Sequence, residues 1–178
     1  MTKNINFLDL GLQPLANNYL NKKELIKKEK KYRLKVGLNL TTKLVSINKP
    51  LSSELMFNDK YPYRSSMSKT MLKSFKDLSI LINKKFKPKK ILEIGSNDGS
   101  FIKNFSKKKV IGIEPCSNIE KITKKNGFNT YAEYWNTKIA NKIFKKEGKV
   151  DLIYSANTIS HIDDLDEVFK SINIILNE

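Results

Sequence analysis

Short apolar segments alternate with longer segments of helical character from residue 90 to the end of the chain. Strands are indicated at Ile91–Ile94, Val110–Ile113, Phe128–Tyr131 and Val150–Ser155. Helices are expected between and after them, at residues 99–107, 118–126, 135–145 and 164–176. This alternation with short connections predicts a parallel sheet wound in right-handed crossovers. We therefore expect an α/β fold that contains the first four strands of a Rossmann-like sheet.

The connection after the first of these strands, Glu93-Ile-Gly-Ser-Asn-Asp-Gly99, carries the strongest functional signal. Gly95 and Gly99 let the backbone turn tightly and approach a ligand without a Cβ in the way. Ligands of such sheets bind beyond the carboxyl ends of the strands. The glycine spacing differs from the G-x-G-x-x-G of dinucleotide-binding proteins. Acidic Glu93 and Asp98 suit the cationic sulfonium and amino end of S-adenosylmethionine better than a pyrophosphate. The alternative is an ordinary glycine-rich turn.

Acidic and polar residues also follow two further strands. Glu114 ends the second strand, where a carboxylate can accept both ribose hydroxyls of an adenosyl group. Asn157 follows the fourth strand and could bond the amino acid part of such a cofactor. His161, the only histidine, could be an acid–base or substrate-binding group. The alternatives are a surface acid and an ordinary loop histidine.

The segment Tyr61-Pro-Tyr-Arg-Ser-Ser-Met-Ser-Lys-Thr70 precedes a helical pattern that runs to about Asn83. Its tyrosines, arginine and hydroxyls could form a polar lid, and Arg64 could bind a diphosphate. The alternative is a segment that only begins the helix, with Ser68 as its N-cap.

The first 50 residues show weaker organisation. An alternating apolar stretch near the N-terminus stops at Pro14, which ends any regular element there. Tyr32–Val36 and Lys43–Ile47 alternate polar and apolar residues and indicate two short strands. The expected organisation is an N-terminal segment over 1–50, a helical lid and linker over 51–88, and the Rossmann-like domain over 89–178.

Composition limits the partners of the chain. The net charge is +16, but nearly all of the excess is lysine, and Arg33 and Arg64 are the only arginines. Because nucleic-acid recognition leans on arginine, we expect a compositional bias and no nucleic-acid partner. No apolar run approaches the roughly 18–20 residues of a membrane helix, and the N-terminus lacks the apolar core of a signal peptide. We therefore expect a cytoplasmic chain without a membrane partner.

Taken together, these motifs make the chain resemble sugar C-methyltransferases that act on nucleotide-linked deoxyhexoses. The similarity runs in order through Asp9–Asn17, Leu55–Phe57, Tyr61–Met71, Glu93–Ser100, Gly112–Pro115 and Asn157–Asp163. It implies S-adenosylmethionine as cofactor and a nucleotide-linked deoxysugar as substrate. The implied cofactor site consists of Gly95, Asn97, Asp98, Glu114 and Asn157, beside Glu93 and Gly99 from the loop argument. The resemblance also implies substrate or catalytic roles for Tyr63 and His161, with Ser65, Ser66 and Ser68 lining the site next to Arg64.

The chain departs from this family in two ways. The family begins with a zinc module of two Cys-x-x-Cys pairs, whereas Asn39 and Thr42 stand at the second pair and Cys116 is the only cysteine. Because these are poor zinc ligands, we expect no metal and a degenerate module. Family members are also considerably longer, and their later half carries a Glu-His pair that serves as the base.

Since this chain ends at Glu178, we expect a truncated class I methyltransferase domain. Turnover would then require a second polypeptide that carries the remaining half. One alternative is a non-catalytic fragment or cofactor-binding module. The other is a nucleic-acid methyltransferase, which the charge of +16 would favour.

Overall fold

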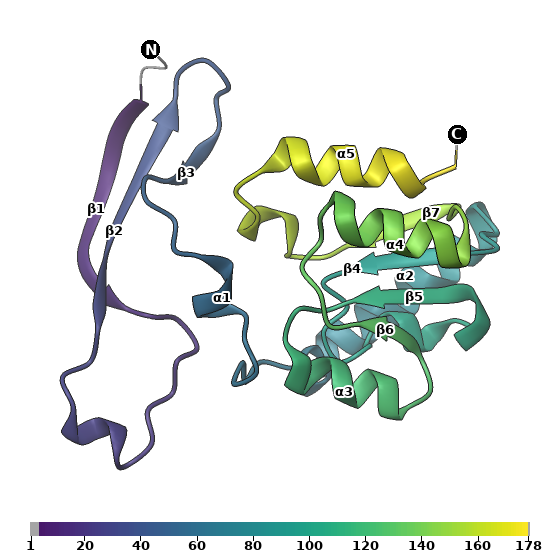
Figure 1. Ribbon diagram of the computed structural model, residues 1–178, viewed down its shortest axis with the longest axis horizontal. Coiled ribbons are helices and arrows are strands. Elements are labelled where there is room, and N and C mark those ends of the chain that lie inside the picture. The colour runs from purple at the N-terminus through teal and green to yellow at the C-terminus, as the bar shows by residue number, and fades with distance from the viewer. Residues whose placement is uncertain (1–3, 178) are drawn as a thin grey trace. The chain divides into compact units, whose positions relative to one another are not determined.

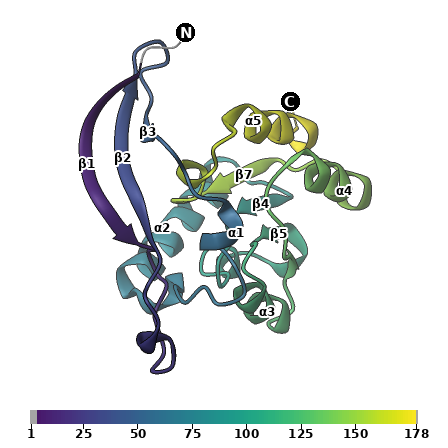
Figure 2. The same ribbon diagram turned by 60° about the vertical axis from the view of Figure 1, so that its left-hand side comes forward.

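The computed structural model describes residues 4–177, and the chain forms two compact units, residues 1–56 and 57–178 (Figure 1). The N-terminal unit contains an antiparallel sheet in the order β1-β2-β3. Its strands are β1 (Asn4–Pro14), β2 (Lys31–Asn39) and β3 (Val45–Ile47), of which β1 and β2 form a long curved pair (Figure 2). A 3-10 turn, η1 (Glu24–Ile26), and a short helix, α1 (Ser53–Met56), complete the unit.

Strand β1 was not expected from the sequence, although it ends at Pro14 as the alternating pattern indicated. It is an edge strand, so it requires only β2 as a partner. Its apolar side chains remain exposed, with Phe7 at 60% and Leu12 at 61%. Among the described residues of this unit only Gly37 is buried, so its sheet does not enclose an apolar core.

The C-terminal unit contains the expected parallel sheet, in the order β6-β5-β4-β7. Its strands are β4 (Ile91–Ile94), β5 (Val110–Ile113), β6 (Asn129–Tyr131) and β7 (Leu152–Ser155). The four strands confirm the α/β, Rossmann-like fold. Because all four are parallel, the loops that follow β4, β5 and β7 emerge at the same edge of the sheet.

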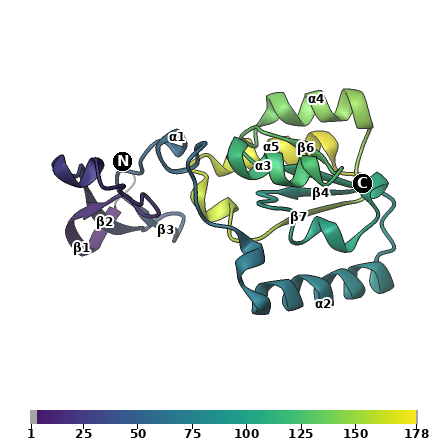
Figure 3. The same ribbon diagram turned by 90° about the horizontal axis from the view of Figure 1, so that it is seen from below.

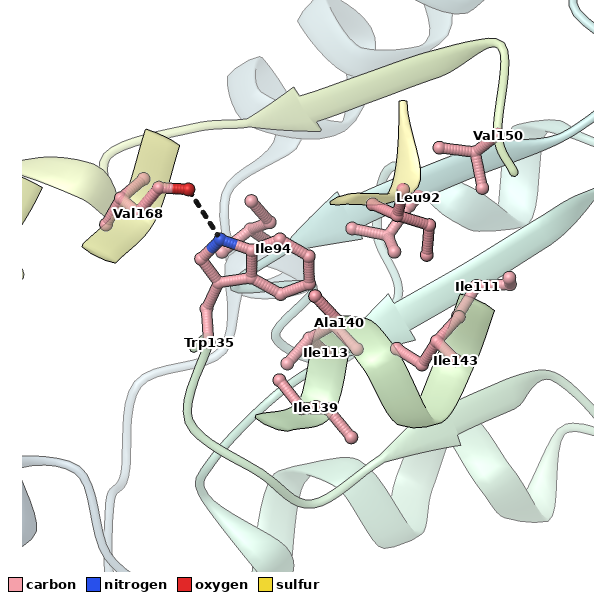
Figure 4. Close-up of a cluster of buried hydrophobic side chains, with 11 residues drawn as sticks. Leu92, Ile94, Ile111, Ile113, Trp135, Ile139, Ala140, Ile143, Val150 and Val168 are labelled. Atoms are coloured by element: carbon pink, nitrogen blue, oxygen red, sulfur yellow. Dashed lines mark hydrogen bonds between the residues drawn. The ribbon is translucent and has the colours of Figure 1, made fainter. Parts of the chain in front are cut away.

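Helices cover both faces of this sheet. They are α2 (Lys69–Lys85), α3 (Ser117–Lys125), α4 (Thr137–Glu147) and α5 (Leu165–Ile175). Figure 3 shows α2 and α4 on opposite sides of the strands. One buried cluster joins α2 to the sheet through Phe75, Ile82, Ile91, Phe101, Ile102, Phe105 and Val110. The other joins α4 and α5 to the opposite face and includes Leu92, Ile94, Ile111, Ile113, Trp135, Ile139, Ile143 and Val168 (Figure 4).

The helix expected over 99–107 is wrong. The structure has two 3-10 turns instead, η3 (Ile102–Asn104) and η4 (Lys107–Lys109). The Asn104 side chain donates to the carbonyl oxygens of Ser100 (3.1 Å) and Phe101 (2.9 Å), as polar side chains do when they compete with a helix. The backbone then becomes extended at Phe105, whose ring packs edge-on against Phe101 in the core, with ring centroids 5.2 Å apart.

No helix among residues 4–177 is both long enough and apolar enough to cross a membrane.

Candidate functional site

The loop after β4 folds back over the end of β5. The backbone N–H groups of Gly95 and Ser96 both donate to the Ile113 carbonyl, at 2.8 and 2.9 Å. Gly95 has φ +75° and Gly99 has φ +78°, values that glycine adopts without strain. A Cβ at Gly95 would lie 2.1 Å from Thr158 Oγ1. The missing side chain therefore lets the loop after β7 pack directly on this turn.

Glu114 fixes the neighbouring backbone at the end of β5. Its Oε2 accepts the Asn97 N–H at 2.9 Å, and its Oε1 accepts the Cys116 N–H at 2.8 Å. Burial raises the pKa of Glu114, and these backbone hydrogen bonds act in the opposite direction. The Cys116 side chain also hydrogen-bonds this carboxylate, so of its roughly four lone-pair positions about one stays available for a ribose hydroxyl.

Glu93 brings a second buried carboxyl to the same edge. The side chain is 3% exposed, and its Oε2 has no hydrogen-bond partner among the described residues. Burial, followed by the charges of Glu114 and Asp98, raises the pKa of Glu93 well above its usual range, while the Ile102 N–H lowers it. A buried carboxyl oxygen without a partner, next to two other acids, suits a cationic ligand group.

The segment before α2 lies on the loop after β4. Asn97 Oδ1 accepts the Ser65 N–H at 2.8 Å, and Asp98 Oδ2 accepts the Ser66 N–H at 3.2 Å. The Asn97 amide also donates to the Tyr63 carbonyl at 3.2 Å. These contacts join two parts of the chain that are more than 30 residues apart in sequence.

His161 is exposed and lies at the end of η5 (Ile159–His161). Its ring centroid is 5.5 Å from that of Phe57, which in turn is 5.4 Å from Tyr61. The Phe57 carbonyl accepts the Tyr134 hydroxyl at 2.6 Å. Sequence reasoning assigned no role to Phe57 or Tyr134. The Leu55–Phe57 similarity was the only signal for the first, and no local pattern indicates the second.

The structure thus brings several sequence-predicted residues to one edge of the sheet. Glu93 lies in β4, the loops after β4 and β5 contain Gly95, Asn97, Asp98, Gly99 and Glu114, and the backbone of Tyr63, Ser65 and Ser66 lies on the loop after β4. Ser68 differs, because its hydroxyl oxygen accepts the Met71 N–H at 3.2 Å and caps α2. Asn157 has φ +53°, and its side chain, like those of Tyr63 and Arg64, is exposed.

These residues fit an S-adenosyl ligand. The turn at Gly95 and Gly99 provides backbone without side chains, Glu93 provides an oxygen that lacks a partner, and Glu114 provides a spare acceptor position. Thr158 and Thr123 cover the positions where side chains of Gly95 and Gly99 would be, so the glycines serve the tight turn, and the fit rests on the two buried acids.

The N-terminal unit does not fit zinc. Asn39 Oδ1 accepts the N–H groups of Thr41 (2.9 Å) and Thr42 (3.0 Å), so Asn39 forms a turn of its own. Residues 4–177 contain no group of three or more His, Cys, Asp or Glu side chains that could hold a metal ion. Cys116 lies in the other unit, where burial raises the pKa of its thiol.

Comparison with known proteins identifies the family of the chain. The family model described as a methyltransferase domain matches residues 63–178, and one described as a putative zinc binding domain matches residues 2–57. The comparison with curated proteins gives no match.

Among solved structures, the chain is similar to the plantazolicin methyltransferase BamL in complex with a triazolic desmethylPZN analog and SAH. The TM-score is 0.49 and the sequence identity 19%, over 64% of this chain and 45% of that chain. This chain thus spans less than half the length of that solved structure. The methyltransferase model covers more than half of the chain. The chain therefore belongs to the methyltransferase domain family, whose cofactor is S-adenosylmethionine.

Proposed function

We propose that this chain holds S-adenosylmethionine beyond the ends of β4, β5 and β7 and acts in methyl transfer to a nucleotide-linked sugar. One observation carries the proposal: two segments distant in sequence meet at the turn after β4. The 63–66 segment reaches it through hydrogen bonds to Asn97 and Asp98, and Thr158 packs on Gly95. This convergence supports a cofactor loop that faces both an acceptor segment and the loop of His161.

The cofactor side of the proposal uses two acids and a polar residue. Glu114 would accept a ribose hydroxyl, because its two oxygens retain acceptor capacity beside their present donors. Glu93 would balance the positive charge at the amino acid end, and Asn157 would bond that end from the loop after β7. When bound, S-adenosylmethionine supplies an electrophilic methyl group.

The acceptor side uses residues that the protein keeps exposed. The side chains of Tyr63, Arg64 and His161 are all exposed near the turn. Arg64 would bind the diphosphate of the sugar nucleotide through its planar guanidinium. Tyr63 and His161 would orient the sugar or move a proton on it. Ser65 and Ser66 would line the site, while Ser68 would contribute through the cap of α2.

Isothermal titration with S-adenosylhomocysteine tests the cofactor side. The full chain should bind this ligand, and Glu114→Gln should weaken binding about tenfold to hundredfold through lost charge and acceptor capacity. Glu133→Gln is the matched control, because Glu133 is half exposed and pairs only with Lys142 at 3.5 Å in the described ion pairs. Absence of binding to the unmodified chain at millimolar ligand would remove the proposal.

A nucleoside diphosphate titrated into the chain with S-adenosylhomocysteine tests the acceptor side. We expect Arg64→Ala to weaken its binding about tenfold, since a hydrogen-bonded charge is lost. Arg33→Ala is the control, because Arg33 is the only other arginine and pairs with Asp9 in the N-terminal unit. Equal effects of both substitutions would indicate general charge attraction and contradict a diphosphate site at Arg64.

The proposal includes a protein partner at the β7 edge. One edge of β7 pairs with β4. At the opposite edge the described residues form a single parallel bridge, between Val150, just before β7, and Leu176. A further parallel strand from a second polypeptide would pair the remaining backbone groups of this edge. Co-expression with a candidate polypeptide should then yield a complex that co-purifies. Leu152→Pro should abolish it, because the alternation that starts with Val150 directs the Leu152 N–H away from β4.

A further inference from the structure

Asn97 holds the 63–66 segment through both polar atoms of its side chain. Its amide nitrogen donates to the Tyr63 carbonyl at 3.2 Å. Its amide oxygen accepts the Ser65 N–H at 2.8 Å, and Ser65 itself is buried. The side chain therefore spans the backbone on both sides of residue 64.

Asp98 makes the adjacent contact. One carboxylate oxygen accepts the Ser66 N–H at 3.2 Å, and the other accepts the Ser100 hydroxyl at 2.6 Å. The hydroxyl of Ser100 thus orients the carboxylate that receives the segment. Asn97 and Asp98 together supply side-chain partners for the backbone of residues 63, 65 and 66.

The backbone of Asn97 is itself fixed from the cofactor side. Asn97 has φ +47°, which asparagine tolerates better than most residues. Its N–H donates to Glu114 Oε2 at 2.9 Å, and its carbonyl accepts the Thr123 hydroxyl at 3.2 Å. One residue therefore contacts the acid at the end of β5 through its main chain and the 63–66 segment through its side chain.

This arrangement gives a short physical route between the two sides of the site. A ligand that hydrogen-bonds to Glu114 changes the acceptor of the Asn97 N–H. Any resulting change in the conformation of Asn97 acts directly on the backbone that carries Tyr63 and Arg64. Such coupling is reciprocal: the factor by which the ligand favours the ordered segment equals the factor by which the ordered segment increases the affinity for the ligand.

We propose that Asn97 and Asp98 are positioning residues that couple occupancy of the cofactor loop to the placement of the 63–66 segment. They hold Tyr63 and Arg64 for the acceptor rather than binding the cofactor through their own side chains. This inference rests on the proposed function, because the coupling requires a ligand at Glu114. It assigns the two side chains a different role from the cofactor contacts that the family resemblance implied.

NMR-detected amide exchange of Ser65 and Ser66 in the full chain tests the inference, with and without S-adenosylhomocysteine. Asn97→Gly removes the side chain while glycine keeps the positive φ. We expect the Ser65 amide to exchange about tenfold faster in this variant, as the loss of a hydrogen bond implies. S-adenosylhomocysteine should slow exchange of both amides in the unmodified chain and leave Ser65 unaffected in Asn97→Gly.

Two comparisons separate positioning from general loss of structure. Asn17→Gly is the matched control, because Asn17 also has a positive φ (61°) but lies in the N-terminal unit. Asp98→Asn keeps an acceptor oxygen and should preserve the Ser66 amide, whereas Asp98→Ala should expose it. If Asn97→Gly does not fold, this Asp98 pair carries the test alone.

The outcomes are distinct. Binding of S-adenosylhomocysteine without a change in Ser65 and Ser66 exchange overturns the inference and leaves the proposed function intact. An Asn97→Gly chain, or an Asp98→Ala chain, that responds to the ligand like the unmodified chain also overturns it. Failure of the unmodified chain to bind the ligand removes the proposed function, and this inference with it.

Discussion

Glu93 is a buried carboxyl group whose position does not favour the folded protein in the absence of a ligand. The side chain is 3% exposed and one of its oxygens lacks a partner in the described part of the chain. Its pKa is raised by burial first and by two neighbouring acids second. Such a group lowers stability when it ionises, so its position is better explained by a cation that it meets in the bound state.

The sign of the pKa shift predicts how stability depends on pH. Because the pKa of Glu93 is higher in the folded chain than its usual 4.5, the folded state binds more protons above that pH. Stability should therefore fall as pH rises from about that value through the raised pKa. Glu93→Gln should reduce this slope, leaving the part that the raised pKa of Glu114 contributes, and should stabilise the chain by about 1 kcal/mol at pH 8 while weakening binding of S-adenosylhomocysteine.

Urea denaturation at pH 5 and pH 8, followed through the single tryptophan, measures this effect. Glu133→Gln serves as control, since half of that side chain is exposed to water. A Glu93→Gln chain with the pH dependence of the unmodified protein would contradict the assignment of the slope to Glu93.

Gly95 allows a second prediction at the level of one residue. An alanine at this position would have to adopt φ +75°, and its Cβ would lie 2.1 Å from the Thr158 side chain. Gly95→Ala should cost about 1–2 kcal/mol from backbone conformation alone, displace the loop after β7 and abolish cofactor binding. Gly148→Ala is the matched control, because Gly148 has the same φ but no atom within 4 Å of the added Cβ. That variant should show the backbone cost and keep full affinity; an affinity loss in both would refute a local role for Gly95.

At the level of elements, strands of the parallel sheet were predictable and their neighbours less so. Ile91–Ile94 and Val110–Ile113 are short, mainly apolar segments buried on both faces, and a strand is the simplest interpretation of such a segment. The apolar residues of 99–107 have the spacing expected of a helix. The Asn104 side chain, however, hydrogen-bonds to two backbone carbonyls of this stretch, and a 3-10 turn forms instead. β1 was not predicted because its apolar side chains are exposed, so their pattern does not mark one face of the strand as buried.

The two-faced sheet yields a prediction about the core. Leu92 in β4 is fully buried in the cluster that contains Trp135 and Ile143. Leu92→Ala should destabilise the chain by about 2–5 kcal/mol, since a cavity would remain between sheet and helices. Leu81→Ala in α2 is the control: Leu81 is 55% exposed, so the expected change is within about 0.5 kcal/mol. Urea midpoints followed by Trp135 fluorescence compare them, and similar losses would argue against this core.

At the level of the whole molecule, the sequence indicated which segments form the site but not how they touch. The glycines and acids of the loop after β4 carry their own local signal. The contacts of Asn97 with Ser65 and of Thr158 with Gly95 join residues 32 and 63 positions apart, and no local pattern encodes such pairs. The same limit applies to Phe57, whose carbonyl is held by Tyr134 across 77 positions.

The two units differ in how they are stabilised, which leads to a prediction about their independence. Both buried clusters consist entirely of residues from 57–178, and so do the candidate cofactor residues. The N-terminal unit buries only Gly37 among its described residues. The folding of the larger unit and its ligand site should therefore not depend on residues 1–56.

A chain of residues 57–178 should fold cooperatively and bind S-adenosylhomocysteine with the affinity of the full chain. Because Trp135 lies in its core and donates to the Val168 carbonyl at 3.4 Å, Trp135 fluorescence reports the integrity of α4 and α5 in both proteins. Calorimetric titration of both proteins measures affinity. A loss of about tenfold, or about 1.4 kcal/mol, on removal of residues 1–56 would show that the N-terminal unit contributes to the cofactor site. Unchanged affinity would instead restrict that unit to another role, such as contact with the acceptor or a partner protein.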